Sequence, residues 1–283
     1  MPPLFDNFRA GISPGWQQQM TGAGGWEVSP DGLRLVNDGA ESDGYTNAQI
    51  DDYQHLPRRD FPWRPPLRLI LRARFSHPSI DETGDLATAL SGTAGFGFWN
   101  DPFGMAGPRS PALPQAAWFF YAAPPSNLKL DIDTPGWGWK AATIDARRWQ
   151  FAALTPTIPL AVPLMNLLPL YRTLWPIGQR AIGVAERSVP VSMTDWHIYS
   201  IDWRTDGVTF GVDGLTLLEA ASAPAGPLGL VVWLDNQYMQ VTPWGQFGWG
   251  TAAKAQRQWL EVDWVAIESS SPNSSSPNSS LPN

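Results

Sequence analysis

The chain has 283 residues, of which 43% are hydrophobic, and its 26 acidic and 19 basic residues give a formal net charge of −7. This acidic balance argues against a nucleic-acid-binding surface, which would be basic, and the absence of cysteine excludes disulfides and thiolate metal sites. No apolar run is long enough to span a membrane and no secretory signal is visible, so a cytoplasmic location is the default expectation.

Short apolar segments bounded by Gly, Pro, Asp or Asn recur along most of the chain, which is typical of β-strands. In residues 67–75, LRLILRARF, apolar and mostly basic side chains alternate, which predicts a strand with one solvent-facing side. Many strands and few helices predict an all-β jelly-roll β-sandwich, with one domain over residues 1–268. The other predicted strands are residues 32–36, 94–100, 116–122, 127–133, 196–203, 207–214, 228–236 and 259–267.

Residues 149–189 break the strand pattern. Leucines and aromatic residues fall near helical spacing there, and four prolines between residues 159 and 176 would kink or divide any helix. We therefore predict a mostly helical apolar insertion that lies on the sandwich. Three interpretations stay open: a part of the core that caps the sheets, a lid over a binding groove, or a self-association surface over residues 160–177 that would make a homo-oligomer.

The last fifteen residues, 269–283, are a Ser/Pro/Asn repeat. Such a composition cannot bury apolar surface, which predicts a disordered tail.

Planar polar and aromatic side chains gather at the ends of two predicted strands, in residues 233–244 and 98–104. Carboxylates and amides can bind hydroxyl groups while rings pack on the apolar face of a sugar, so we expect both strand ends to line one cleft. Alternatively, the acidic and amide groups at 235–236 cap the backbone of a turn. With two aromatic residues of 116–122, the predicted ligand-binding residues are Trp99, Asn100, Asp101, Trp118, Tyr121, Trp233, Asp235, Asn236, Gln237, Tyr238 and Trp244.

Four segments resemble the concanavalin A-like lectin/glucanase superfamily, in particular the glycoside hydrolases of family 16. They are FDNF at 5–8, GFGFWN at 95–100, WHIYSIDWRTDGVTFGVDG at 196–214 and LEVDWVAI at 260–267. The resemblance implies a concanavalin A-like jelly roll with an oligosaccharide ligand, and a structural hydrogen-bonding role for His197. It also places Asp263 near a structural calcium site, although calcium needs six to eight oxygen ligands.

The catalytic signature of that family, Glu-x-Asp-x-x-Glu on one strand, is absent from this sequence. A retaining glycosidase needs two carboxyl groups about 5–5.5 Å apart. Of the two segments that could replace the signature, residues 116–122 contain no acid. The other, residues 128–133, would place Asp131 and Asp133 beside Lys129 on one strand face, either as a divergent catalytic pair or as a solvated surface.

The sequence therefore favours a carbohydrate-binding or divergent carbohydrate-active protein rather than an ordinary retaining glucanase. The alternative is a binding protein, or an enzyme other than a glycosidase, for a hydrophobic small molecule held under the insertion. The position of the insertion separates the two hypotheses. An insertion that covers residues 233–238 and encloses an apolar cavity would disfavour a sugar ligand.

Overall fold

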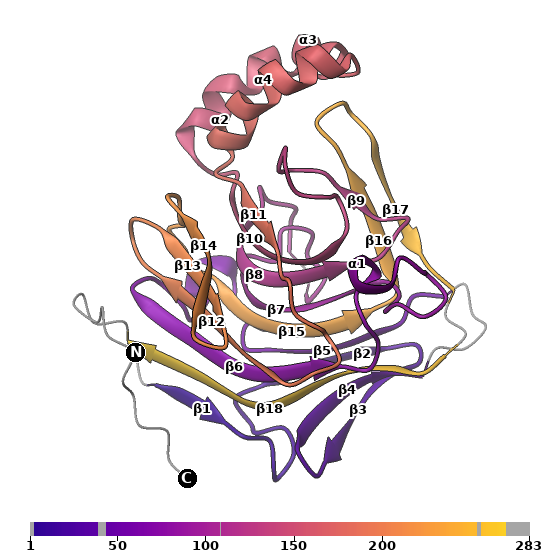
Figure 1. Ribbon diagram of the computed structural model, residues 1–283. Helices are drawn as coiled ribbons and strands as arrows, with labels where there is room; N and C mark the ends of the chain where they lie inside the picture. The colour runs from indigo at the N-terminus through magenta and orange to yellow at the C-terminus, as the bar shows by residue number, and fades with distance from the viewer. Residues whose placement is uncertain (1–2, 39–43, 108, 254–255, 270–283) are drawn as a thin grey trace.

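Two antiparallel sheets, one of eight strands and one of seven, stack face to face in the computed structural model. The helices of the insertion lie above the seven-stranded sheet (Figure 1). The structure describes residues 3–38, 44–107, 109–253 and 256–269, so the predicted tail lies outside the described residues except for Ser269. The predicted β-sandwich of jelly-roll type with a helical insertion is confirmed.

The first sheet has the order β14-β13-β12-β6-β18-β4-β3, and β1 pairs with β18. Strand β6 coincides with the predicted residues 67–75, and its alternate residues are buried, because one face packs on the core and the other meets solvent. The strands are β1 (Leu4–Asp6), β3 (Gly24–Ser29), β4 (Gly32–Asn37), β6 (Leu67–Phe75), β12 (His197–Trp203), β13 (Val208–Val212), β14 (Leu215–Ala220) and β18 (Gln258–Ser269).

The second sheet has the order β11-β10-β8-β7-β15-β5-β2, and a small sheet β17-β16-β9 stands beside it. Each predicted strand in this part of the chain is present except residues 127–133, of which only the first two residues form a strand. The strands are β2 (Gln17–Thr21), β5 (Asn47–Asp51), β7 (Thr93–Trp99), β8 (Gln115–Ala122), β9 (Asn127–Leu128), β10 (Gly138–Asp145), β11 (Ala185–Ser188), β15 (Gly229–Asp235), β16 (Gln237–Val241) and β17 (Phe247–Thr251).

Aromatic side chains from both sheets fill the space between them. Phe119 of β8 lies 5.0 Å from Tyr199 of β12 and 5.5 Å from Phe210 of β13, measured between ring centroids. Trp139 of β10 lies 5.8 Å from Tyr199. Each such pair contributes about 0.5–1.5 kcal/mol beyond the area it buries. The seven-stranded sheet therefore has one face in this core, and its other face is free to carry a site.

The insertion consists of α2 (Trp149–Leu154), the 3₁₀ turn η2 (Thr155–Thr157), α3 (Ile158–Leu164) and α4 (Leu168–Ala181). Proline stands in the first turn of α3 and of α4, where its missing N–H group leaves no bond unmade, and Pro163 and Pro176 lie inside these helices. The last residues of the predicted insertion form β11 and join the sheet. The remaining short helices are η1 (Arg58–Asp60) and α1 (Ile80–Thr83), and no helix among the described residues is long and apolar enough to cross a membrane.

Candidate functional site

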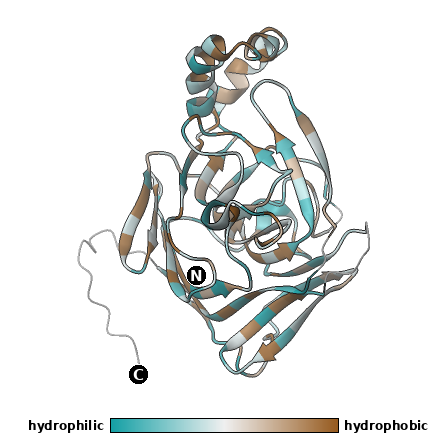
Figure 2. Ribbon diagram, turned by 45° about the vertical axis from the view of Figure 1, so that its right-hand side comes forward, coloured by the Kyte–Doolittle hydropathy of each residue, from teal (hydrophilic) through white to brown (hydrophobic). Residues whose placement is uncertain are grey.

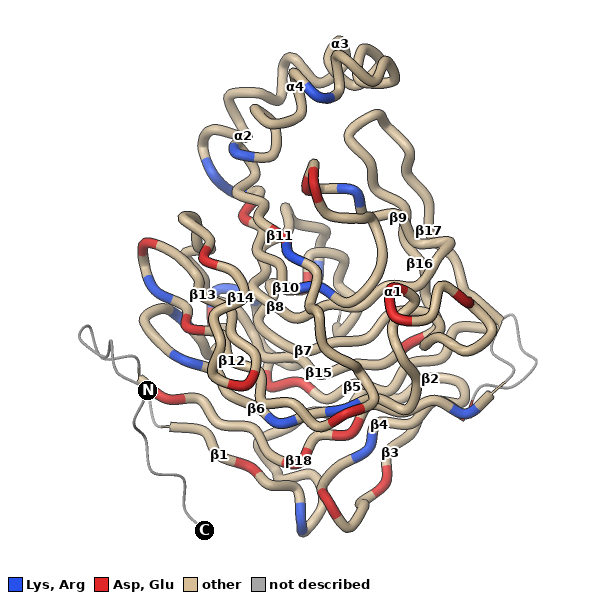
Figure 3. The backbone as a smooth tube through the Cα atoms, in the orientation of Figure 1, with Lys and Arg blue, Asp and Glu red and all other residues tan. Residues whose placement is uncertain are grey.

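A cavity of about 1260 Å³ lies between the outer face of the seven-stranded sheet and helices α2, α3 and α4. The loop of residues 102–114 and the hairpin β16–β17 form its sides. The helices contain many hydrophobic residues (Figure 2), and neither they nor the hairpin carry an acidic residue (Figure 3). The cavity is therefore bordered by elements without negative charge that the chain adds around the sheet, and exposed wall residues such as Leu160 and Trp249 show that it opens to solvent.

Four aromatic rings form the floor of the cavity. Trp118 and Phe120 alternate along β8, so both point away from the sandwich core, and their rings stack at 5.2 Å. Trp99 of β7 lies 5.8 Å from Trp118, and Trp233 of β15 lies 5.4 Å from it. The floor is thus a continuous aromatic surface that crosses three neighbouring strands.

Two glycines of β7 make room for this aromatic floor. Gly95 pairs with Trp233 and Phe120 across the sheet, and a Cβ atom at Gly95 would lie 2.8 Å from the Trp233 ring. A Cβ atom at Gly97, which has φ +142°, would lie 2.6 Å from Cα of Trp118. Only glycine allows rings from the two flanking strands to approach each other over β7.

A chain of hydrogen bonds fixes the polar end of the cavity. The indole N–H of Trp233 donates to Oγ1 of Thr93 at 3.1 Å, and the Thr93 hydroxyl donates to Oδ1 of Asp235 at 2.8 Å. The same oxygen accepts the backbone N–H of Gln237 at 2.9 Å. These bonds hold the Trp233 ring in place, and Gln49 and Tyr238 add further polar groups to this end of the cavity wall.

A buried ion pair lies on the other side of the floor, where β10 meets β11. The ammonium group of Lys140 lies 3.0 Å from Oε2 of Glu186, and the two side chains are 1% and 7% exposed. Burial raises the pKa of Glu186, and Lys140 opposes this rise. Among the described residues that line the cavity, Asp235 and Glu186 are the carboxylates. Four strand spacings, about 19 Å across the sheet, separate their strands, and Asp235 lies a further four residues along β15 from the position in register with Glu186.

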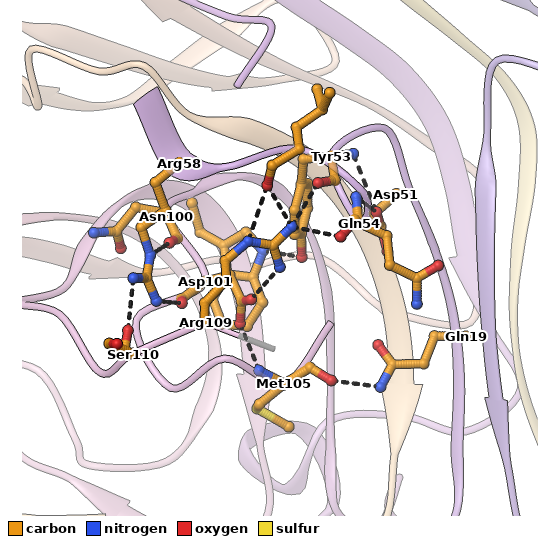
Figure 4. A network of polar contacts seen from close by, with 12 residues as sticks. Gln19, Asp51, Tyr53, Gln54, Arg58, Asn100, Asp101, Met105, Arg109 and Ser110 are labelled. Atoms are coloured by element: carbon orange, nitrogen blue, oxygen red, sulfur yellow. Dashed lines mark hydrogen bonds and ion pairs between the residues drawn. The ribbon is translucent and has the colours of Figure 1, made fainter. Parts of the chain in front are cut away.

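Two arginines fix the loop that forms one side of the cavity (Figure 4). The buried guanidinium of Arg109 forms an ion pair with Asp101 at 2.9 Å and donates to the carbonyl groups of Tyr53, Gln54 and Leu56. Arg58 donates to the carbonyl groups of residues 100, 101 and 110. We call this network the arginine clamp. It holds Phe103, Met105 and Leu113 of the loop against the cavity.

Six of the eleven predicted ligand-binding residues lie on the cavity wall, and whether they contact a ligand stays a prediction. Trp99 comes from one predicted strand end, four of the others come from the second, and Trp118 lies in the middle of β8, so residues of both ends line the same cavity. The six residues are Trp99, Trp118, Trp233, Asp235, Gln237 and Tyr238.

The other five predicted residues do not line the cavity. Asn100 and Asp101 shape the loop after β7, where the Asn100 carboxamide accepts the backbone N–H of Gln115. Tyr121 points into the core, because it is an odd step along β8 from Trp118 and Phe120. The remaining two have local partners: Asn236 caps the backbone of residues 44, 46 and 252, and Trp244 packs edge-on against Tyr171 of α4 at 5.3 Å.

The expectation that Asp131 and Asp133 share a strand face is wrong, because residues 129–133 form a loop. Oδ1 of Asp131 accepts the backbone N–H groups of Asp133 and Thr134, and Oδ2 accepts from Gln179 of α4. Asp131 thus caps a turn and ties it to the insertion, and its side chain is satisfied by these bonds. Neither aspartate lines the cavity, so the geometry lends no support to a catalytic pair.

Asp263 does not fit the calcium site that the resemblance implies. Its two carboxylate oxygens lie 2.7 Å from Arg9 and 2.6 Å from Arg72, so two cationic groups already occupy the positions that a cation would need. Among the described residues, no three His, Asp or Glu side chains converge as a metal site would require. His197 has the expected structural role, since its Nδ1 lies 2.6 Å from Oδ2 of Asp213.

Phe120, Thr93 and Gln49 are wall residues that the sequence analysis missed. The spacing of Phe120 two residues after Trp118 was a usable signal, because it places both rings on one face of a strand. No such signal in the sequence indicates that the insertion and the loop of residues 102–114 line the cavity. They depend on which face of the sheet these segments cover.

No protein-family model matches the chain, and no curated protein matches its sequence. Solved structures match its fold with a TM-score of 0.50. The apo Crh5 transglycosylase is 14% identical over 95% of this chain and 85% of its own. A family 16 endo-glucanase from Bacteroides ovatus is 11% identical over 94% and 99%, and a GlcNAcα1-4Gal-releasing endo-β-galactosidase from Clostridium perfringens is 11% identical over 93% and 61%. The chain therefore has the concanavalin A-like fold of the family 16 glucanases, as the sequence predicts.

Proposed function

We propose that this protein binds a hydrophobic small molecule in the cavity between the aromatic floor and the helical insertion. The observation that carries the proposal is the aromatic floor. Its rings Trp118 and Phe120 lie on β8, one of the two segments that could have replaced the catalytic signature, and β8 contains no acidic residue. The cavity volume of about 1260 Å³ exceeds the 300–1,000 Å³ of common drug-sized sites. An elongated or polycyclic ligand with a small polar end fits this combination of size and chemistry.

The free energy of burial favours an apolar ligand over a sugar. Each 100 Å² of apolar surface removed from water contributes about 2.5 kcal/mol. A sugar hydroxyl placed against the floor rings without a partner costs about 1–3 kcal/mol instead. The polar groups at this end of the wall, among them Gln49 and Tyr238, suit the polar end of a lipid-like molecule.

The two carboxylates on the wall do not support glycoside hydrolysis. Retaining enzymes place their carboxyl groups about 5–5.5 Å apart and inverting enzymes about 6.5–9.5 Å apart. The strands of Asp235 and Glu186 are four spacings apart, about 19 Å across the sheet, and the two residues are also offset along the strands. Glu186 is also held by Lys140, and Asp235 by Thr93 and Gln237. Binding without glycosidic bond cleavage is the function that this arrangement favours.

Carbohydrate binding is the second candidate, and one observation outside the cavity floor favours it. Phe247 and Trp249 on β17 are both 67% exposed, with ring centroids 5.4 Å apart. The amides of Gln240 and Gln246 lie on the same hairpin and are joined by a hydrogen bond of 3.2 Å. Exposed rings beside amides suit a sugar, and the known activities of the fold neighbours are consistent with such a ligand.

Titration with the solvatochromic dye Nile red tests the proposal. The wild-type protein should shift the dye emission to the blue with saturable binding. Trp118→Ala and Trp233→Ala should each weaken binding about tenfold or more, since each removes an aromatic wall worth about 1.5–3 kcal/mol of burial. The matched control is Phe5→Ala, because Phe5 is 68% exposed on β1 of the other sheet and should leave binding unchanged.

Calorimetric titration with a β-glucan oligosaccharide tests carbohydrate binding, the second candidate function. Saturable oligosaccharide binding by a folded protein that leaves Nile red emission unshifted would overturn the proposal and favour the second candidate. Circular dichroism of each variant establishes that it is folded before its affinity is compared.

A further inference from the structure

Helices α2, α3 and α4 form the outermost layer above the seven-stranded sheet (Figure 1). They expose large apolar side chains. Trp149 is 74% exposed, Leu167 is 60% exposed and Leu168 is 58% exposed. None of these three lines the cavity, so their exposed surface faces outward rather than into the site. An exposed apolar surface of this kind marks an interaction site.

The charge of this layer is opposite in sign to that of the whole protein. Residues 149–184 contain Arg172 and Arg180 and no acidic residue, while the chain as a whole has a net charge of −7. Arg148 adds a third cation at the start of α2. Figure 3 shows basic residues and no acidic ones on these helices. Basic residues among exposed Trp and Leu are typical of segments that lie in the interface of an anionic membrane.

The tip of the hairpin β16–β17 is joined to the insertion, so both belong to one surface. Asn166 donates to the carbonyl of Trp244 at 3.2 Å, and Trp244 packs against Tyr171 of α4 at 5.3 Å. Residues 237–251 of the hairpin carry no charged side chain. We call the exposed residues of 149–181, among them Trp149, Leu167, Leu168, Arg172 and Arg180, the docking surface, together with the hairpin turn of residues 242–246.

We propose that the docking surface binds peripherally to an anionic lipid membrane and brings the mouth of the cavity to the lipid. The exposed Leu160 and Ile177 belong both to the insertion and to the cavity wall, so apolar surface continues from the helices into the cavity. The binding itself rests on the outer residues and their charge, and it does not require that the cavity hold a ligand.

A second copy of the chain is a less favourable occupant of the same surface. In a symmetric contact each copy would bring Arg172 and Arg180 toward the partner, and residues 149–184 offer no carboxylate to pair with them. Anionic lipid headgroups supply the missing charge. Each arginine near such a surface strengthens binding by roughly fivefold.

Cosedimentation with large unilamellar vesicles tests the docking surface. The wild-type protein should sediment with vesicles that contain phosphatidylglycerol, should bind pure phosphatidylcholine vesicles more weakly, and should lose affinity as salt is added. The triple variant Trp149→Ser/Leu167→Ser/Leu168→Ser should lower vesicle affinity at least tenfold. Arg172→Gln/Arg180→Gln should remove most of the preference for phosphatidylglycerol.

The matched control is Leu215→Ser. Leu215 is 76% exposed in β14 at the edge of the other sheet, and its loss should leave vesicle binding unchanged. A wild-type protein that stays in solution with both kinds of vesicle would overturn the proposal, as would a triple variant that sediments like the wild type. A dimer in sedimentation equilibrium that the triple variant abolishes, without vesicle binding, would assign the surface to a second copy. Nile red binding is measured in the absence of vesicles and tests the cavity alone. A failure of the docking surface can therefore be distinguished from a failure of ligand binding in the cavity.

Discussion

At the scale of single residues, the ion pair between Lys140 and Glu186 allows a direct test of how the cavity wall is stabilised. Both side chains are buried, so removing one partner leaves an unpaired charge. Lys140→Met should lower the free energy of unfolding by about 3 kcal/mol at pH 7, measured by urea denaturation. Lys140→Met/Glu186→Met should recover most of this loss, because it removes both charges.

The effect of Lys140→Met should depend on pH with a defined sign. Burial already raises the pKa of Glu186, and loss of Lys140 removes the group that opposes this rise, so the pKa of the folded variant lies further above that of the unfolded chain. The unfolded chain titrates near 4.3. The stability that the variant loses through Glu186 is therefore small below about pH 4 and grows as pH rises from there through the folded pKa. A loss of stability that is the same at pH 4 and pH 7 would contradict this explanation.

At the scale of elements, the arginine clamp determines the position of the loop of residues 102–114. Arg109→Lys keeps the charge but loses the planar group that donates to three carbonyl groups and pairs with Asp101. We expect the free energy of unfolding to fall by about 2 kcal/mol and the affinity for Nile red to fall with it. Arg59→Lys is the matched control, because the Arg59 side chain is 85% exposed and the change should cost under about 0.5 kcal/mol.

Elements whose form depends on local pattern could be predicted from the sequence. Apolar and mostly basic residues alternate over residues 67–75, and β6 buries every second residue accordingly. Residues 128–133 alternate as well, yet they form a loop, because Asp131 bonds to the backbone two and three residues later and to Gln179 of α4. The period-two pattern cannot distinguish a strand from a turn capped by an aspartate whose other partner lies 48 residues away.

At the scale of the whole molecule, the aromatic floor was partly predictable and the cavity was not. Trp99, Trp118 and Trp233 could be selected because aromatic residues at strand positions pack or bind. That their rings meet on the outer face depends on the strand order β8-β7-β15 and on two glycines in the middle strand. The cavity also depends on where the insertion lies, which the helical spacing of residues 149–189 does not specify.

The sandwich and the cavity should be separable by removing the insertion. The main core between the sheets contains no residue of 147–181, and the backbone N–H of Asp145 bonds to the carbonyl of Ile182 at 2.9 Å, so the chain ends on either side lie close together. A variant in which a short Gly/Ser linker joins Ala146 to Ile182 should keep the β-sheet circular dichroism spectrum and a cooperative unfolding transition. It should lose Nile red binding and vesicle binding together, because it lacks both the roof of the cavity and the docking surface. A shortened protein that folds and still binds Nile red with wild-type affinity would mean that the sheet face alone holds the ligand.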